Sequence, residues 1–306
     1  MLTKETLTLG TVLKKDFVHL CFRKGPTELY EKYMDQTEVS VIVSTYNSEE
    51  WLRKVLWGFN CQSYRNFEVV IADDGSGPAT KALLEDMQRQ VFYSIVHVWQ
   101  EDEGFQKSRI LNKAILACST EYIIMTDGDC IPREDFVEVH YINKEPRYFI
   151  SGGYYMLPMN ISKAITKEDV AQQNCFDINW LKSQGIAKTF KNNKLTAKGY
   201  LSKMFNRLTT TNASWNGHNS SGWKNDILAV NGFDERMQYG GQDRELGERL
   251  FNLGIRSKQL RYSAVCIHLD HSRGYRTPES IAKNMAIRKE VKKTGSKWTP
   301  YGIIKK

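Results

Sequence analysis

The sequence predicts a doubly wound α/β fold, in which helices cover both faces of a mostly parallel sheet. Two observations support this prediction. Short apolar runs that end in Ser, Thr or Asp alternate with amphipathic segments along residues 37–150. The runs have the length of strands buried on both faces, whereas the segments between them repeat at helical spacing. Parallel strands joined in this way end at one edge of the sheet, where ligands bind.

The first strand and helix have the clearest signals. The run "EVSVIVST", residues 38–45, is continuously apolar before it reaches Ser44 and Thr45, which indicates a buried strand. Ser48 and two following Glu predict a helix N-terminus, because a serine caps free backbone N–H groups and acids favour the first turn. The apolar residues from Trp51 to Phe59 recur at helical spacing.

The strand and helix cycle continues to residue 129. We expect further strands and helices in alternation, at residues 66–74, 79–90, 93–100, 104–118 and 121–129.

The rhythm breaks after residue 156. Residues 160–208 form a Lys- and Asn-rich region with patchy helical character. Beyond it we expect helices at 224–230 and 242–253 and a strand at 259–271. The first 36 residues show no clear period and are interpreted as an arm.

Composition bounds the class of protein. The chain has 306 residues, 41% of them hydrophobic, which is enough for a sizeable core. Since no stretch approaches the roughly 20 apolar residues of a membrane span, we expect a cytoplasmic protein, and the six well-separated cysteines fit reduced thiols there.

The positive charge is concentrated at the C-terminus. From Ser272 onward there are ten Lys or Arg against two Glu, a difference of +8 that equals the net charge of the chain. A basic tail is often only a solvated surface. Because this one also holds Trp298, Tyr301, Ile303 and Ile304, we expect peripheral contact with an anionic membrane rather than with nucleic acid.

The stretch "IIMTDGDCIP" predicts a buried strand that ends at two acidic residues. Asp127 and Asp129 flank Gly128, so both carboxylates can converge on one cation while the glycine permits a close turn. Hard carboxylate oxygens suit Mg²⁺ or Mn²⁺, which bridge to nucleotide phosphates. Further polar residues should reach the same edge of the sheet: Thr45, Tyr46, Asn47, Asp73, Asp74, Lys107, Arg109 and Asn112.

These motifs occur in a recognisable order. "VSVIVSTYNSEEWLRKVLWGFNCQSYRNFEVVIADDGS", "KSRILNKAI" and "MTDGD" resemble the nucleotide-binding half of the family 2 glycosyltransferases. The resemblance covers roughly residues 37–135. It implies the GT-A fold, with a Rossmann-like, mostly parallel central sheet flanked by helices and fused to an acceptor-binding half.

The resemblance also implies roles for the matched residues. Ser44 to Tyr46 and Asp73 would hold the uridine, and Asp74 and Arg109 would lie at the base and diphosphate. Asp127 would contact the ribose or the metal, and Asp129 would bind the metal directly.

The second half resembles a narrower group. "VNGFDERMQYGGQDRELGERL" is similar to a segment of β-1,4-galactosyltransferases and bacterial chondroitin polymerases in which G-G-E-D supplies the catalytic base. That base corresponds to Asp243, whereas Gln242 stands where an acid is usual. In "HLDHSR", His268 and His271 match the remaining metal ligands, and imidazole beside carboxylate favours Mn²⁺ over Mg²⁺.

Aromatic residues of the second half are candidates for the acceptor site. Trp215, Trp223 and Tyr239, with the loop "GHNSSGW" and Gln242, could stack on sugar rings and close over them, or the aromatic rings could belong to the core.

The expected function is an inverting, metal-dependent transfer of a hexose or N-acetylhexosamine from a UDP-sugar to a hydroxyl of a glycan or lipid-linked glycan, in surface polysaccharide or lipopolysaccharide synthesis. The alternatives are a sugar-phosphate nucleotidyltransferase, which requires an early Gly-rich phosphate loop, and a non-catalytic glycan-binding module. The expected parts are an arm (1-36), a nucleotide-sugar-binding half (37-150), an acceptor-binding and catalytic half (151-275) and a basic tail (276-306).

Overall fold

The computed structural model describes residues 37–272 and 276–305. Glu38–Lys306 forms one compact unit. The predicted arm, residues 1–36, lies outside the described residues.

The first half confirms the predicted alternation. Apart from shifts of a few residues at their ends, its strands and helices follow the expected order: β1 (Val39–Thr45), α3 (Glu49–Asn60), β2 (Phe67–Asp73), α4 (Pro78–Gln88), β3 (Ile95–Trp99), α5 (Lys107–Ala117) and β4 (Tyr122–Asp127).

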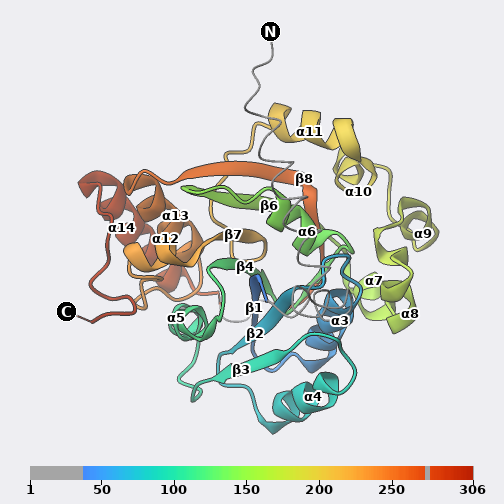
Figure 1. Cartoon of the computed structure of the whole chain (residues 1–306), viewed down its shortest axis with the longest axis horizontal. Coiled ribbons are helices and arrows are strands. Elements are labelled where there is room, and N and C mark those ends of the chain that lie inside the picture. The colour runs from blue at the N-terminus through green and yellow to red at the C-terminus, as the bar shows by residue number, and fades with distance from the viewer. Residues whose placement is uncertain (1–36, 273–275, 306) are drawn as a thin grey trace, which may run out of the picture. The chain divides into compact units, whose positions relative to one another are not determined.

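In the described residues, eight strands form one sheet in the order β3-β2-β1-β4-β7-β6-β8-β5 (Figure 1). The remaining strands are β5 (Cys130–Pro132), β6 (Tyr148–Met156), β7 (Ser220–Trp223) and β8 (Arg256–His268). Strands β3, β2, β1 and β4 are parallel, and β7 runs antiparallel to both of its neighbours. The mostly parallel α/β sheet is therefore confirmed, and β6 runs through the expected boundary at residue 150.

Apolar side chains cover both faces of the sheet. Val41 and Val43 of β1 belong to one buried cluster with Leu52 of α3. Ile42, between them, points the other way and packs in a second cluster with Ile110 of α5. Successive strand residues face opposite sides, so a strand that must be apolar on both faces becomes the continuous run seen in the sequence.

Strand β7 contradicts the expected loop at "GHNSSGW". Ser220, Ser221 and Gly222 are buried in the middle of the sheet. Ser221 hydrogen-bonds through its Oγ to Tyr122 at 2.8 Å and to His140 at 2.7 Å. Because hydrogen bonds rather than apolar packing fix this strand, it has no apolar run that would reveal it.

Helices outnumber strands among the described residues of the second half. The region 160–208 is patchily helical, as expected, and helices also occur at the two predicted later positions. Their bounds are α6 (Phe136–Ile142), α7 (Met159–Ala164), α8 (Lys167–Ala171), α9 (Ile178–Ser183), α10 (Asn193–Thr196), α11 (Gly199–Leu208), α12 (Lys224–Ala229), α13 (Gln242–Asn252) and α14 (Pro278–Thr294).

The C-terminal segment folds back onto the domain. Asn231 donates from Nδ2 to the carbonyls of Thr299, at 2.7 Å, and Ile304, at 2.9 Å. Arg236 lies over the ring of Tyr301 at 3.6 Å. The tail is therefore part of the packed structure. Among the described residues, no helix is long and apolar enough to cross a membrane.

Candidate active site

A cavity of about 720 Å³ opens at the carboxyl ends of β1, β2 and β4. Such a volume suits a nucleotide-sized ligand. The walls opposite these strands come from the start of α13 and from the segment that follows β8. Both halves of the chain therefore contribute to one site, as expected for parallel strands that end at one edge.

The Asp-Gly-Asp turn lies at the base of this cavity. The Gly128 N–H donates to the carbonyl of Ser44 at 2.7 Å, and a Cβ at Gly128 would stand 2.9 Å from that oxygen. Glycine is required because β1 approaches so closely. The turn lets the two carboxylates reach different partners.

Asp127 is neutralised by the protein. Its Oδ1 accepts hydrogen bonds from Lys107 Nζ at 2.6 Å and from Ser44 Oγ at 2.7 Å. Although burial alone would raise the pKa of Asp127, the charge and hydrogen bond of Lys107 hold it well below its usual range. Asp127 is therefore ionised at neutral pH.

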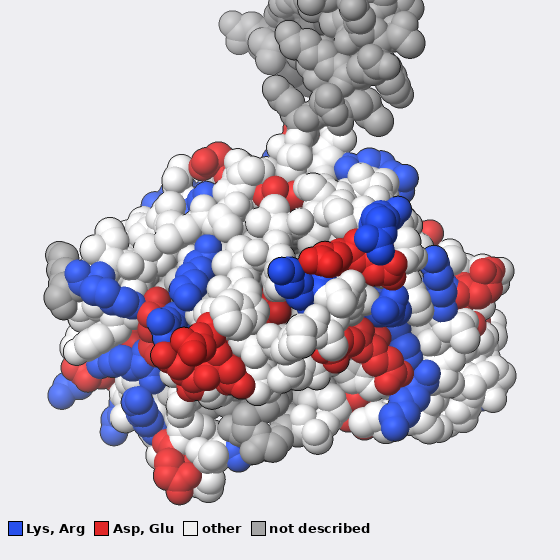
Figure 2. Space-filling view, turned by 90° about the horizontal axis from the view of Figure 1, so that it is seen from below, with Lys and Arg blue, Asp and Glu red and all other residues white. Residues whose placement is uncertain are grey.

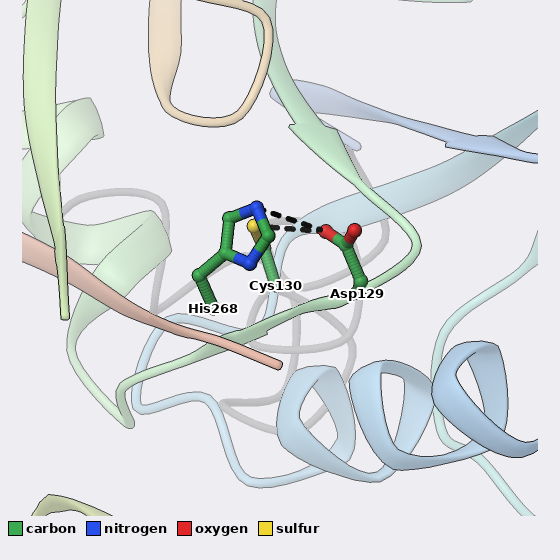
Figure 3. Close-up of side chains that lie close together, drawn as sticks. All are labelled: Asp129, Cys130 and His268. Atoms are coloured by element: carbon green, nitrogen blue, oxygen red, sulfur yellow. Dashed lines mark hydrogen bonds and ion pairs between the residues drawn. The ribbon is translucent and has the colours of Figure 1, made fainter. Parts of the chain in front are cut away.

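Asp129 faces two imidazoles instead. His271 Nε2 lies 2.9 Å from Asp129 Oδ2, and His268 Nε2 lies 3.9 Å from Oδ1. Burial raises the pKa of Asp129, but the hydrogen bond to His271 and the charge of His268 outweigh it, and the pKa is lowered. Figure 3 shows Asp129, His268 and Cys130 directed at one another, with Cys130 Sγ 3.3 Å from Asp129 Oδ1.

Backbone carbonyls set the orientation of both histidine rings. His268 Nδ1 lies 2.8 Å from the Leu269 carbonyl, and His271 Nδ1 lies 2.8 Å from the Ser272 carbonyl. A carbonyl can only accept, so each Nδ1 carries the proton and each Nε2 faces Asp129. In neutral rings these are lone pairs directed at a carboxylate, an arrangement that either protonation of the rings or a bound cation relieves. The residues therefore fit a divalent metal with mixed oxygen and nitrogen ligands.

The nucleotide side of the cavity is lined by loops after β1 and β2. Ser44, Thr45, Tyr46 and Asn47 line it, as does Asp74. Thr45 Oγ1 is buried and has no hydrogen-bond partner among the described residues. Burial raises the pKa of Asp74 to about 6, against hydrogen bonds from Gln106 and Gln100.

Asp243 lies in the first turn of α13 and lines the cavity. Its Oδ1 is buried without a hydrogen-bond partner among the residues described. A Cβ at Gly217 would stand 2.8 Å from this oxygen, so only glycine leaves room for it. Burial raises the pKa of Asp243, although the charge of Lys107 opposes the shift. A desolvated carboxylate with one free oxygen is suited to accept a proton.

Three predicted nucleotide-side residues do not line the cavity. Asp73 is fully buried and accepts from the Ser76 N–H at 2.8 Å. Arg109 pairs with Glu103, and Asn112 Nδ2 is held by the Phe233 carbonyl at 2.9 Å. Asp73 and Asn112 shape the loops around the site and do not face it.

Two of the predicted acceptor aromatics are also outside the cavity. Trp215 is 0% exposed and packs in the core with Phe149. Trp223 packs on Tyr122, and its Nε1 donates to the Glu145 carbonyl at 2.8 Å. The alternative interpretation of these rings as core residues is correct for Trp215. Tyr239 and Gln242 do line the cavity, and Gln242 Oε1 accepts from the Gly240 N–H at 3.0 Å.

Sequence reasoning missed Tyr154 and included His218 only as part of the loop "GHNSSGW", and both residues line the cavity. Their rings meet edge to face at 4.6 Å between centroids. Burial lowers the pKa of His218 to about 4, so its ring is neutral at pH 7. His218 stands in "GHN", directly before β7. Because the sequence does not predict that strand, the histidine looks like any loop residue and indicates no specific role.

The comparisons with known proteins agree with this geometry. The sequence model of Glycosyl transferase family 2 matches residues 40–207, more than half of the chain. The chain belongs to this family. It is a glycosyltransferase.

Similarity to individual family members is lower but long. The chain is 24% identical to the uncharacterized glycosyltransferase YfnE of Bacillus subtilis, over 81% of this chain and 69% of YfnE. It is 23% identical to chondroitin synthase of Escherichia coli, over 89% of this chain and 40% of the synthase. The match to GlyA of Streptococcus pneumoniae is 32% identical but spans 34% of this chain and 14% of GlyA.

Solved structures confirm the GT-A fold. GalNAc-T7 with UDP, GalNAc and Mn²⁺ matches at a TM-score of 0.57 and 13% identity, over 84% of this chain and 48% of that one. Staphylococcus aureus TarS 1-349 with UDP-GlcNAc matches at 0.52 and 15% identity, over 82% and 65%.

Proposed function

We propose that this glycosyltransferase moves a hexose or N-acetylhexosamine from a UDP-sugar to a glycan hydroxyl with inversion, using Mn²⁺ or Mg²⁺. The observation that supports the proposal most is the sharing of one cavity by Asp129, His268 and His271 with Asp243. Solved relatives of the same fold hold UDP or a UDP-sugar, in one case with Mn²⁺. Glycan synthesis at the cell surface is the proposed setting, because chondroitin synthase is among the relatives.

The donor would lie along the carboxyl ends of β1, β2 and β4. Thr45, Tyr46 and Asp74 would hold the uracil and ribose, with Thr45 Oγ1 offering a free hydroxyl. Lys107 would compensate negative charge beside Asp127, since its ammonium already stands at the cavity wall.

Asp129, His268 and His271 would hold the metal. When bound, a divalent ion supplies positive charge that stabilises the leaving diphosphate. The two imidazoles favour Mn²⁺ over Mg²⁺.

Asp243 would take the proton from the acceptor hydroxyl through its carboxylate, which lines the cavity. Its raised pKa strengthens it as a base. Since no second carboxylate is assigned as a nucleophile, a single displacement follows, and it inverts the anomeric centre. Tyr239 and Gln242, at the same wall, would contact the acceptor.

UDP release tests the proposal. The protein is mixed with Mn²⁺ and a panel of UDP-sugars, and free UDP is measured with and without EDTA. Metal-dependent UDP release supports the transferase, pyrophosphate formation supports a nucleotidyltransferase, and no turnover of any donor contradicts the proposed donor class.

A first prediction concerns the base. Asp243→Asn should lower transfer by about 10²-fold or more, because the amide cannot accept the proton. Binding of UDP with Mn²⁺, measured by calorimetry, should stay within a few-fold, since Asp243 is not assigned to either ligand. Asp226→Asn, on the neighbouring α12, is the matched control. Substantial transfer by Asp243→Asn would refute its role as the base.

A further inference from the structure

Helix α11 (Gly199–Leu208) has an inverted polarity. It buries Ser202 and Asn206, while Tyr200, Leu201 and Leu208 are 80%, 51% and 67% exposed. A surface helix normally turns its apolar side chains toward the core. Large apolar side chains on the outer face of an ordered helix indicate a surface that contacts something else.

The contacts beneath α11 explain why it cannot rotate to bury these side chains. Asn206 Oδ1 accepts from the Tyr262 N–H at 2.8 Å, and its Nδ2 donates to Ser263 Oγ at 2.8 Å. The β6–β8 pairing jumps from Leu260 to Val265 at this point, so the residues between them lack ladder partners on β6. Asn206 supplies hydrogen bonds to two of these residues, Tyr262 and Ser263. Rotation would leave buried polar groups unpaired, at a high cost.

The outward face forms a band along α11. Leu201 and Leu208 are seven residues apart and half-buried Met204 lies between them, so the three share one helical face beside Tyr200. Phe190, 69% exposed, continues the band, because its ring lies 6.0 Å from that of Phe205 on α11. We call Phe190, Tyr200, Leu201, Met204 and Leu208 the α11 band.

Basic side chains flank the band. Between Asp177 and Asp226 the sequence has seven Lys and one Arg but no acidic residue. Several of these are exposed next to the band: Lys188, Lys191, Lys198, Lys203 and Arg207. The face of the molecule seen from below, away from α11 in Figure 1, carries acidic and basic residues side by side (Figure 2). The charged side chains of α11 and of the segments on either side of it in the sequence are, by contrast, all basic.

We propose that the α11 band and its flanking basic side chains form a docking surface for an anionic lipid bilayer. Exposed aromatic and aliphatic side chains beside a row of Lys and Arg are the features of a helix that lies in a membrane interface. A second copy of this chain fits the surface poorly, because a two-fold contact would place the basic side chains against their equivalents.

Vesicle flotation tests the inference with the full chain. The vesicles are phosphatidylcholine alone or phosphatidylcholine mixed with phosphatidylglycerol. We expect binding to the mixed vesicles that weakens with added salt. Tyr200→Ser/Leu201→Ser/Leu208→Ser should lower the partition coefficient at least about tenfold, because three apolar side chains no longer leave water. Lys203→Gln/Arg207→Gln should lower it about fivefold per charge.

A matched variant controls for general loss of exposed apolar surface. Leu116, Ile142 and Met285 are 56%, 67% and 62% exposed on other helices or their ends. Leu116→Ser/Ile142→Ser/Met285→Ser should bind vesicles as the unmodified protein does. Circular dichroism checks that each variant is folded.

The tail prediction is tested in the same assay. Truncation would remove contacts to Asn231, so Ile304→Ser, at a position 61% exposed, is the better probe. Unchanged flotation of the α11 triple variant, or flotation that Ile304→Ser alone abolishes, would overturn the α11 assignment. So would sedimentation showing a dimer that the triple variant dissociates.

Discussion

Strands β4 and β7 are neighbours in the sheet but are held in place by different forces. Strand β4 reads "YIIMTD" and packs apolar side chains on both faces, whereas β7 reads "SSGW" and is fixed by hydrogen bonds. The contrast extends to the two halves of the site. Strands β1, β2 and β4 of the nucleotide side are built largely from apolar residues, whereas the Asp243 side adds buried polar groups such as Arg249 and Asn284 to an apolar cluster. Part of the stability on the second side therefore depends on a few specific polar contacts.

The largest expected effect is at Arg249, which is 0% exposed. Its guanidinium holds both oxygens of Glu245, at 2.6 and 2.7 Å, and donates to the carbonyls of Val230 and Gly232. Arg249→Met should lower the free energy of unfolding by about 3–5 kcal/mol, because it leaves a buried carboxylate unpaired. Urea denaturation measures this loss.

Two variants sharpen the comparison at Arg249. Adding Glu245→Gln to Arg249→Met should restore part of the stability, since the unpaired charge is gone. Arg89→Met, in the nucleotide half, breaks an exposed pair with Asp86 and should cost less than about 1 kcal/mol. Equal losses for Arg249→Met and Arg89→Met would contradict the contrast between the halves.

The next effect is a pH dependence set by His140. Asn219 Nδ2 donates to the carbonyls of Gly153 and Ala264, at 2.7 and 3.0 Å, so its Oδ1 faces His140 Nε2 and requires a proton there. The other ring nitrogen accepts from Ser221. Burial lowers the pKa of His140 to about 4 from 6.5. The folded ring is therefore neutral at pH 7.

The sign of the effect follows from proton binding. Below pH 6.5 His140 binds a proton in the unfolded chain but stays neutral in the folded chain. The neutral ring therefore contributes its full stability above pH 6.5, and this contribution is lost as the pH falls through about 4. The free energy of unfolding is measured at a series of pH values between 6.5 and 4 for both proteins. Over this range we expect the loss of stability to be about 3 kcal/mol smaller in His140→Gln than in the unmodified protein. Parallel curves for the two proteins would contradict the assignment.

These buried polar contacts also explain what the sequence could predict. The strands up to Asp127 can be predicted because both of their faces must be apolar, which gives continuous apolar runs. The acids that follow them lie at one edge of the sheet because the strands are parallel. Strand β7 has no such pattern, since its partners Tyr122 and His140 are distant in the chain. For Trp215 the sequence leaves both the acceptor site and the core open, because an aromatic ring has the same signature in a core as on a sugar.

The proposed metal ligands Asp129, His268 and His271 could be predicted from the sequence only in part. A resemblance to a short motif indicated His268 and His271, and no apolar period could have placed them beside Asp129. Their position depends on β5 pairing with β8, where Cys130 lies opposite His268. That pairing joins segments more than a hundred residues apart and becomes visible only in the fold.

The smallest expected effect is at Asn284 of α14, which is 0% exposed. Its Nδ2 lies 2.9, 3.2 and 2.9 Å from the carbonyls of Gln238, Tyr239 and Gly240, the turn that leads into Asp243. Asn284→Ala should destabilise the protein by about 1–3 kcal/mol and lower kcat up to about tenfold, because the turn loses its donor and Asp243 its fixed position. Affinity for UDP with Mn²⁺ should not change. Asn252→Ala is the matched control, because Asn252, at the end of α13, donates from Nδ2 to the Ser296 carbonyl at 2.8 Å. A lower melting temperature with unchanged kcat in Asn284→Ala would show that α14 stabilises the domain without positioning the base.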